Sequence, residues 1–282
     1  MFKHLALTCF LSFGSLALYA PHSHAEGDLP HYRKGLALKG EGNIDGAIAA
    51  FEKVVKINPG NGNAWASLGH LYKKQNKLDK AKVSYQNATR LLPKDANLHA
   101  NLGMTYYRLD DPKSAVTSLK MACKLDPKDH HTRANLGTIH RKLGNLTEAE
   151  RQLRWAAYLA PDDSEIMNNL GVAFRMAKKN DKAIKAFQKA IRLDDQVALY
   201  HFNLGVAYRV SKQVDLAIGA YEIATILDPK KPDAWYDLGH MHRTNGDNPA
   251  AISALTTYLD LTEGKNKKAD KQLREEIKAL MR

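Results

Sequence analysis

The sequence predicts an all-α solenoid in which seven helix-turn-helix repeats are followed by a C-terminal capping helix. The first observation is a glycine that recurs every 34 residues, and the second is an alanine that recurs in the same register. A fixed period of this length is typical of repeat proteins, in which each unit buries its apolar face against its neighbours. The glycines are Gly35, Gly69, Gly103, Gly137, Gly171, Gly205 and Gly239, and the alanines are Ala47, Ala81, Ala115, Ala149, Ala183, Ala217 and Ala251.

The third observation is the spacing of apolar residues inside each unit. They recur at intervals of three, four and seven, which is the period of a helix with one buried face, and the second half of the unit repeats the pattern. Seven units therefore give fourteen antiparallel helices. Gly42, Gly144 and Gly246 fit left-handed helix ends, and prolines such as Pro59 and Pro93 end the second helix of a unit. Invariant glycine and alanine indicate helices too close for larger side chains.

Around each glycine the residues follow the order W-x-x-L-G-x-x-Y, and alanine, a large apolar residue, alanine and proline come later in the unit. Residues 62–93 carry this order at nearly every position. The pattern resembles that of the tetratricopeptide repeat (TPR) family, and the resemblance covers residues 28 to about 263. It implies a right-handed superhelix with a concave binding face. We expect the repeat array to occupy residues 26–264.

The last segment, residues 265–282, does not continue the period. Ala269, Leu273, Ile277, Leu280 and Met281 nevertheless fall on one helical stripe. We predict a capping helix that covers the last repeat, because the end of a solenoid must be shielded from water. A basic helix on a membrane surface is the alternative, suggested by the lysines of the segment.

The N-terminal segment has a different composition. A lysine precedes the apolar run 5–20, and Ser23 and Ala25 place small residues where signal peptidase cleaves. We predict a signal peptide over residues 1–25, cleavage after Ala25, and export to the periplasm. An uncleaved membrane anchor is the alternative, but the run is shorter than the roughly 20 apolar residues that span a bilayer. We therefore do not expect an integral membrane protein.

Charge and cysteine usage constrain the exported chain. Cleavage removes one of 42 basic residues and none of the 30 acidic ones, so the formal net charge falls from +12 to +11. A basic protein favours acidic or neutral partners. Cys9 is lost with the signal peptide, so the remaining Cys123 has no intramolecular disulfide partner. We predict that Cys123 is a small buried apolar residue.

The first helix of each repeat carries polar residues on the side opposite its core, which the family resemblance places on the concave surface. One repeat position forms an asparagine ladder and another a basic rail, and aromatic residues lie toward the C-terminal end. The ladder is Asn101, Asn135, Asn169 and Asn203; the rail is Lys73, Tyr107, Arg141, Arg175, Arg209 and Arg243; the aromatic residues are Phe202 and Tyr236.

The chemistry of this set indicates a peptide ligand. An asparagine carboxamide carries donors and an acceptor, as pairing with the N–H and C=O of an extended peptide requires, and arginines pair with carboxylates. The ladder resembles that in the TPR superhelix of O-linked N-acetylglucosamine transferase, where asparagines hold substrate polypeptide. The resemblance extends to the binding mode alone, because no glycosyltransferase domain is present. The alternative is that asparagine is a consensus residue here and serves solubility.

Other classes of function have little support. The sequence has no phosphate-binding loop and no nucleophile motif, so we expect neither an enzyme nor a cofactor. We interpret His130 and His131 as structural residues and expect no metal; the same holds for His240 and His242, which point to different helix faces. The period of 34 residues and the export signal argue against nucleic acid.

The sequence therefore predicts an exported scaffold that binds an extended, acidic or neutral segment of a partner protein. Its expected role is that of an adaptor in envelope assembly, secretion or protein maturation. The alternative is that the arginine-lined face binds an acidic envelope polymer or an anionic lipid surface.

Overall fold

The computed structural model describes residues 27–263 and 266–282, which form fifteen helices. The predicted signal peptide lies outside these residues. The first helices of the repeats are α1 (Leu29–Gly40), α3 (Gly62–Lys74), α5 (Ala96–Arg108), α7 (His130–Lys142), α9 (Ser164–Met176), α11 (Ala198–Val210) and α13 (Pro232–Thr244). The second helices are α2 (Ile44–Ile57), α4 (Leu78–Leu91), α6 (Pro112–Leu125), α8 (Leu146–Leu159), α10 (Asn180–Leu193), α12 (Val214–Leu227) and α14 (Asn248–Thr262), and α15 (Lys267–Leu280) follows them.

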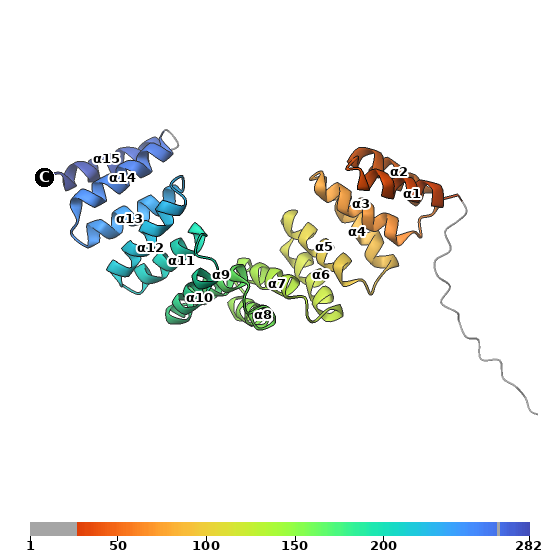
Figure 1. The fold of residues 1–282 in the computed structure, drawn as a ribbon, viewed down its shortest axis with the longest axis horizontal. Coiled ribbons are helices and arrows are strands. Elements are labelled where there is room, and N and C mark those ends of the chain that lie inside the picture. The colour runs from red at the N-terminus through yellow and green to blue at the C-terminus, as the bar shows by residue number, and fades with distance from the viewer. Residues whose placement is uncertain (1–26, 264–265) are drawn as a thin grey trace, which may run out of the picture.

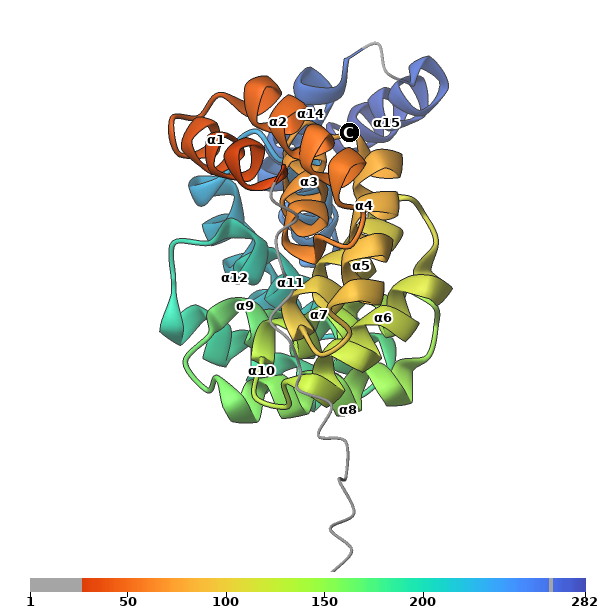
Figure 2. The ribbon, with the colours of Figure 1, turned by 90° about the vertical axis from the view of Figure 1, so that its right-hand side faces the viewer.

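The helices form an arch, with α1 and α15 at its two ends and α7 to α10 at its base (Figure 1). Each first helix packs on the second helix of its own repeat, and each second helix packs on the first helix of the next repeat. Seen along the arch, the repeats wind around a common axis (Figure 2). The predicted all-α array of helix pairs is confirmed.

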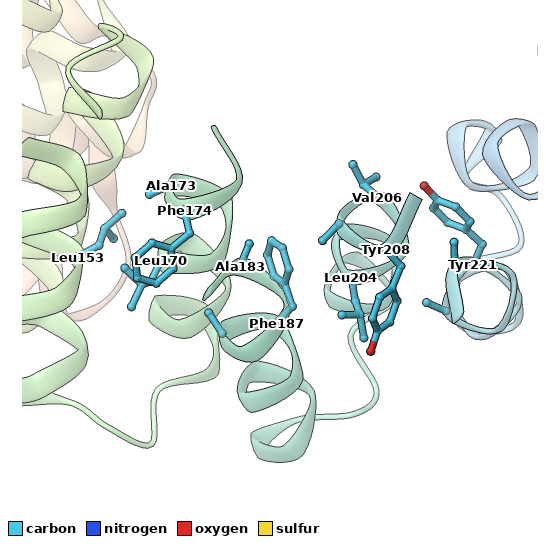
Figure 3. Packing of buried hydrophobic residues seen from close by; sticks show 14 of the residues in the cluster. Leu153, Leu170, Ala173, Phe174, Ala183, Phe187, Leu204, Val206, Tyr208 and Tyr221 are labelled. Carbon is cyan, nitrogen blue, oxygen red and sulfur yellow. The ribbon is translucent and has the colours of Figure 1, made fainter. Parts of the chain in front are cut away.

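Glycine and alanine hold the two helices of a repeat together. All seven repeat alanines are fully buried. Each repeat glycine faces a large buried side chain of its own repeat, and an added β-carbon would lie within 2.9 Å of that side chain in every case. Figure 3 shows three of these side chains, Leu153, Phe187 and Tyr221, in the core. The close approach that the sequence predicts therefore lies inside each repeat.

The turn between the two helices of a repeat contains one residue in the left-handed conformation, at the same position in all seven repeats. Gly42, Gly144 and Gly246 have φ values of 78°, 76° and 84°, as predicted for left-handed helix ends. In the other four repeats the position is occupied by residues with a β-carbon, which the sequence pattern did not identify. These are Asn76, Asp110, Lys178 and Lys212, with φ between 57° and 60°.

Helix α15 covers the end of the array. Its Leu273 and Ile277 are buried in a cluster with Leu255 and Leu259 of α14. These contacts are those expected of a capping helix, whereas the predicted boundaries at residues 26, 264 and 265 stay predictions. The membrane-surface alternative is not needed to explain the apolar stripe, because its two central residues are buried against α14.

Two further expectations concern single residues and membrane segments. Cys123 is a free, buried cysteine as predicted, and burial raises the pKa of its thiol. None of the helices that the structure describes combines the length and the apolar character of a bilayer-spanning segment.

Candidate binding face

The first helices α5, α7, α9 and α11 lie on the inner side of the arch near its base (Figure 1). They contact one another directly across repeats, since α5 packs on α7, α7 on α9 and α9 on α11. A residue on a first helix is therefore brought next to the corresponding residue of the following repeat. This places the predicted ladder and rail side by side along the face.

The two outer members of the ladder are used inside the protein. Asn101 accepts a hydrogen bond from Lys73 Nζ at 2.6 Å and donates one to the carbonyl of Asn97. Asn203 is only 8% exposed and donates to Asn168 Oδ1 at 2.8 Å. Both carboxamides therefore already use hydrogen-bonding groups that a peptide ligand would need. Partner binding by all four asparagines stays a prediction, and these bonds distinguish Asn101 and Asn203 from the other two.

The two inner members of the ladder are different. Asn135 on α7 and Asn169 on α9 are half-buried, and neither side chain makes a hydrogen bond to another residue in the described part of the chain. Each therefore keeps its donors and its acceptor for a ligand. The part of the ladder that is free to bind lies at the base of the arch.

The residues of the basic rail also differ in whether they have partners within the protein. At the C-terminal end, Arg243 pairs with Glu276 of α15, and Arg209 lies 3.9 Å from Asp237 and donates from Nε to the Tyr221 hydroxyl at 3.3 Å. Asp237 itself accepts from Tyr221 at 3.1 Å. These two arginines therefore have intramolecular partners, and their predicted role in ligand binding stays a prediction.

At the base of the arch, Arg141 and Arg175 have no carboxylate partner among residues 27–263 and 266–282. Arg141 donates one side-chain hydrogen bond within the described residues, from Nη1 to Sδ of Met176 at 3.7 Å, and the Nε atoms of both arginines are buried without an acceptor. Burial lowers the pKa of Arg141; Tyr107 opposes this shift, and the like charge of Arg175 adds to it. Two neighbouring guanidinium groups thus lack the counter-charge that a bound carboxylate would supply.

Tyr107 of the predicted rail and the predicted aromatic residues Phe202 and Tyr236 all have neighbours within the chain. Tyr107 lies under Lys142, whose Nζ is 4.8 Å from the ring centroid. Phe202 packs against Tyr221 and carries Lys231 Nζ at 4.4 Å, so one side of its ring is already covered. Tyr236 is 40% exposed and lies beside His240 and Tyr258. Of the three, Tyr236 offers the most ring surface to a ligand.

A cluster of potential metal ligands lies at the N-terminal ends of α7 and α9. His130 and His131 begin α7, and Asp163 precedes α9; their ligand atoms all lie within 4.8 Å of one another. The sequence drew attention to the two histidines but not to Asp163. This residue lies 32 positions after His131, and only the stacking of the repeats brings the two together.

The comparisons with known proteins agree with this architecture. The family model for the cilia and flagella-associated protein 70 C-terminal domain matches residues 30–227, and a tetratricopeptide repeat model matches residues 202–266. The first match covers more than half of the chain. The chain belongs to this tetratricopeptide repeat family. No curated protein sequence matches this TPR protein.

Solved structures show the same fold. The C-terminal part of a TPR repeat-containing protein from Cytophaga hutchinsonii aligns with a TM-score of 0.69 and 19% identity over 84% of this chain and 97% of that part. Pseudomonas aeruginosa pilF aligns with 0.64 and 21% identity over 76% and 97%. YrrB, described as a TPR protein with an unusual peptide-binding site, aligns with 0.55 and 17% identity over 68% and 97%. Identities this low establish the fold alone.

Proposed function

We propose that this TPR protein is a scaffold that binds an extended, acidic segment of a partner protein at the base of its arch. The observation that carries the proposal is the distribution of satisfied and unsatisfied groups on the concave face. The outer ladder and rail residues have partners in the chain. Within the described residues, the side chains of Asn135, Asn169 and Arg175 have none, and Arg141 has the sulfur of Met176 but no carboxylate.

These four residues offer two kinds of recognition on two adjacent helices. Asn135 and Asn169 can pair with peptide N–H and C=O groups, which is independent of the ligand's sequence. Arg141 and Arg175 can pair with carboxylates, which selects acidic side chains. The binding mode proposed for the asparagines is that of the ladder in O-linked N-acetylglucosamine transferase, restricted to two members. The peptide-binding site in the description of YrrB supports a peptide ligand on the same fold.

The first experiment measures the affinity of the chain without residues 1–25 for a fluorescent peptide of alternating aspartate and serine. Asn135→Ala combined with Asn169→Ala should weaken binding by about 1 to 3 kcal/mol, because both lose hydrogen bonds to the ligand. The matched control is Asn101→Ala, whose carboxamide already bonds to Lys73 and Asn97. Equal effects of the control and the double variant would refute the two-member ladder.

The second experiment tests the acidic preference. Arg175→Gln should reduce the difference in affinity between the aspartate peptide and its asparagine analogue, because the carboxylate loses its partner. Arg243→Gln is the control, since Arg243 pairs with Glu276 in the free protein. A preference for aspartate that survives Arg175→Gln and Arg141→Gln together would contradict the proposed site.

A polyanion at the same face is the second candidate, supported by the formal net charge of +12. A polymer of fixed charge releases counterions when it binds, so its affinity falls steeply with salt. A peptide held largely by its backbone has a shallow salt dependence. A steep dependence for an acidic polysaccharide, together with no effect of the asparagine variants, would favour the polymer.

We further propose that the scaffold is exported to the periplasm and acts as an adaptor in envelope assembly, secretion or protein maturation. This rests on the composition of residues 1–25. The description of the matched family names a protein of cilia and flagella instead. Mass spectrometry of the protein from its natural source separates the two: an N-terminus at Glu26 supports export, and a chain that still begins at Met1 refutes cleavage.

A further inference from the structure

We propose that His130, His131 and Asp163 form a binding site for a divalent transition-metal ion that links the fourth repeat to the fifth. The site shares no residue with the proposed peptide-binding region. Asn135 follows His131 by four residues, about 6 Å along the helix, and Arg141 follows it by ten residues, about 15 Å. Because the two sites use different side chains, each can be changed by its own substitutions.

The geometry brings three ligand atoms from two repeats to one point. The rings of His130 and His131 have centroids 4.1 Å apart, and all three ligand atoms lie within 4.8 Å of one another. Asp163 caps α9, and its Oδ1 accepts from the Ile166 amide at 2.9 Å. This bond fixes the carboxylate in place and leaves Oδ2 for a metal ion.

Only a small adjustment would complete the site. Ligand atoms bound tetrahedrally at roughly 2.0–2.2 Å from zinc are separated by about 3.3 Å. His131 is exposed, so its ring can rotate without disturbing the core. The residues line a hollow of about 490 Å³ together with Ala160, Pro161 and Asp162, which leaves room for the ion and for water.

The ligand types select the class of metal. Two imidazoles and one carboxylate suit zinc, nickel or copper, whereas magnesium and calcium prefer oxygen ligands alone. Three protein ligands leave a fourth position for water. The positive helix ends of α7 and α9 oppose a cation. Asp162 and Asp163 offset this effect with two negative charges at the same hollow.

Corresponding positions in neighbouring repeats provide an internal comparison. Asp95 caps α5 as Asp163 caps α9, with its Oδ1 accepting from an amide at 3.1 Å. The preceding first helix begins with Gly62 and Asn63 where α7 begins with two histidines. A capping aspartate thus recurs at α5, α7 and α9, whereas two histidines at the start of a first helix occur only in the fourth repeat.

Metal binding would join α7 to α9 at the base of the arch, where these helices already contact each other (Figure 1). An ion held by residues of two repeats binds the folded array more tightly than the unfolded chain, in which Asp163 is no longer held beside the two histidines. Zinc should therefore raise the melting temperature and protect the amides of α7 and α9 from hydrogen exchange.

The test is calorimetric titration of the tag-free, metal-free full chain with Zn²⁺. We expect one ion per chain, loss of binding in His130→Gln combined with His131→Gln, and at least tenfold weaker binding in Asp163→Asn. Asparagine retains the helix cap, so the last variant keeps its fold. The controls are Asp95→Asn and His70→Gln, which change a capping aspartate and an exposed histidine elsewhere.

The thermal shift with Zn²⁺ gives a second measurement. It should vanish in the double histidine variant and persist in both controls. The proposal is overturned if the unmodified chain binds no zinc above the level of the double histidine variant. It is also overturned if His70→Gln removes binding to the same extent.

Discussion

Replacing Gly171 with alanine tests whether the glycine column is a packing requirement. A β-carbon at this position would lie 2.5 Å from Cε1 of Phe187 and within 2.9 Å of two other ring atoms. Phe187 is fully buried among other core side chains, so its ring can move only if these neighbours also shift. The collision should cost about 1 to 3 kcal/mol, as overpacking does elsewhere.

Helix propensity acts in the opposite direction, because alanine in a helix is favoured over glycine by about 1 kcal/mol. Gly219 separates the two effects. It lies inside α12, and a β-carbon there would meet nothing within 4 Å. Gly219→Ala should stabilise the protein. Since both variants gain the same propensity, the difference between their free energies of unfolding isolates the collision.

The assay is urea unfolding followed by circular dichroism, with hydrogen exchange of α9 and α10 because repeat arrays unfold in stages. Placing Gly171→Ala in a Phe187→Ala background should convert the substitution from destabilising to stabilising, since the colliding ring is gone. Equal stabilisation by Gly171→Ala and Gly219→Ala in the natural background would refute the packing argument.

Two further predictions concern single residues. Burial lowers the pKa of His140, opposed by Glu148, and neither ring nitrogen has a partner. As the pH falls, His140 is protonated in the unfolded chain before it is protonated in the folded one, so the free energy of unfolding decreases below about pH 6.5. Urea unfolding at pH 7.5 and 5.5 measures this decrease, which His140→Tyr should reduce. A decrease of the same size in the variant would contradict the prediction. Lys178→Gly should raise the urea midpoint by relieving a left-handed residue, worth about 0.5 to 1 kcal/mol, and a lower midpoint would exclude that strain.

Much of the fold could be predicted because each structural requirement recurs. A single glycine such as Gly171 can occur for many reasons, but seven glycines in one register indicate a shared packing requirement. The structure shows that each of them faces a large side chain of its own repeat. The helix pairs, the left-handed turn glycines and the burial of Cys123 follow from such local patterns. The left-handed conformation of Lys178 was not predicted, because lysine is not typical of residues with a positive φ. Lys178 lies one period after Gly144, and this equivalent position in the repeat was the available signal.

The candidate site was less predictable because it depends on pairs of residues from different repeats. The same column contains Asn101, bonded to Lys73, and Asn135, which is free. The sequence did offer one clue: Asp237 occupies the ladder position of the seventh repeat, where it could be expected to attract the rail residue Arg209 before it. The proximity of Asp163 to His131 had no local signal at all.

The direct packing of α7 on α9 also defines a spacing for the ligand. Packed helices lie roughly 8–10 Å apart, so Asn135 and Asn169, like Arg141 and Arg175, are separated by about that distance across the face. A polyproline II segment advances about 3.1 Å per residue and completes a turn in three residues. Every third side chain then points the same way, about 9 Å from the last. Partner segments with a carboxylate at every third residue would present consecutive charges to consecutive repeats.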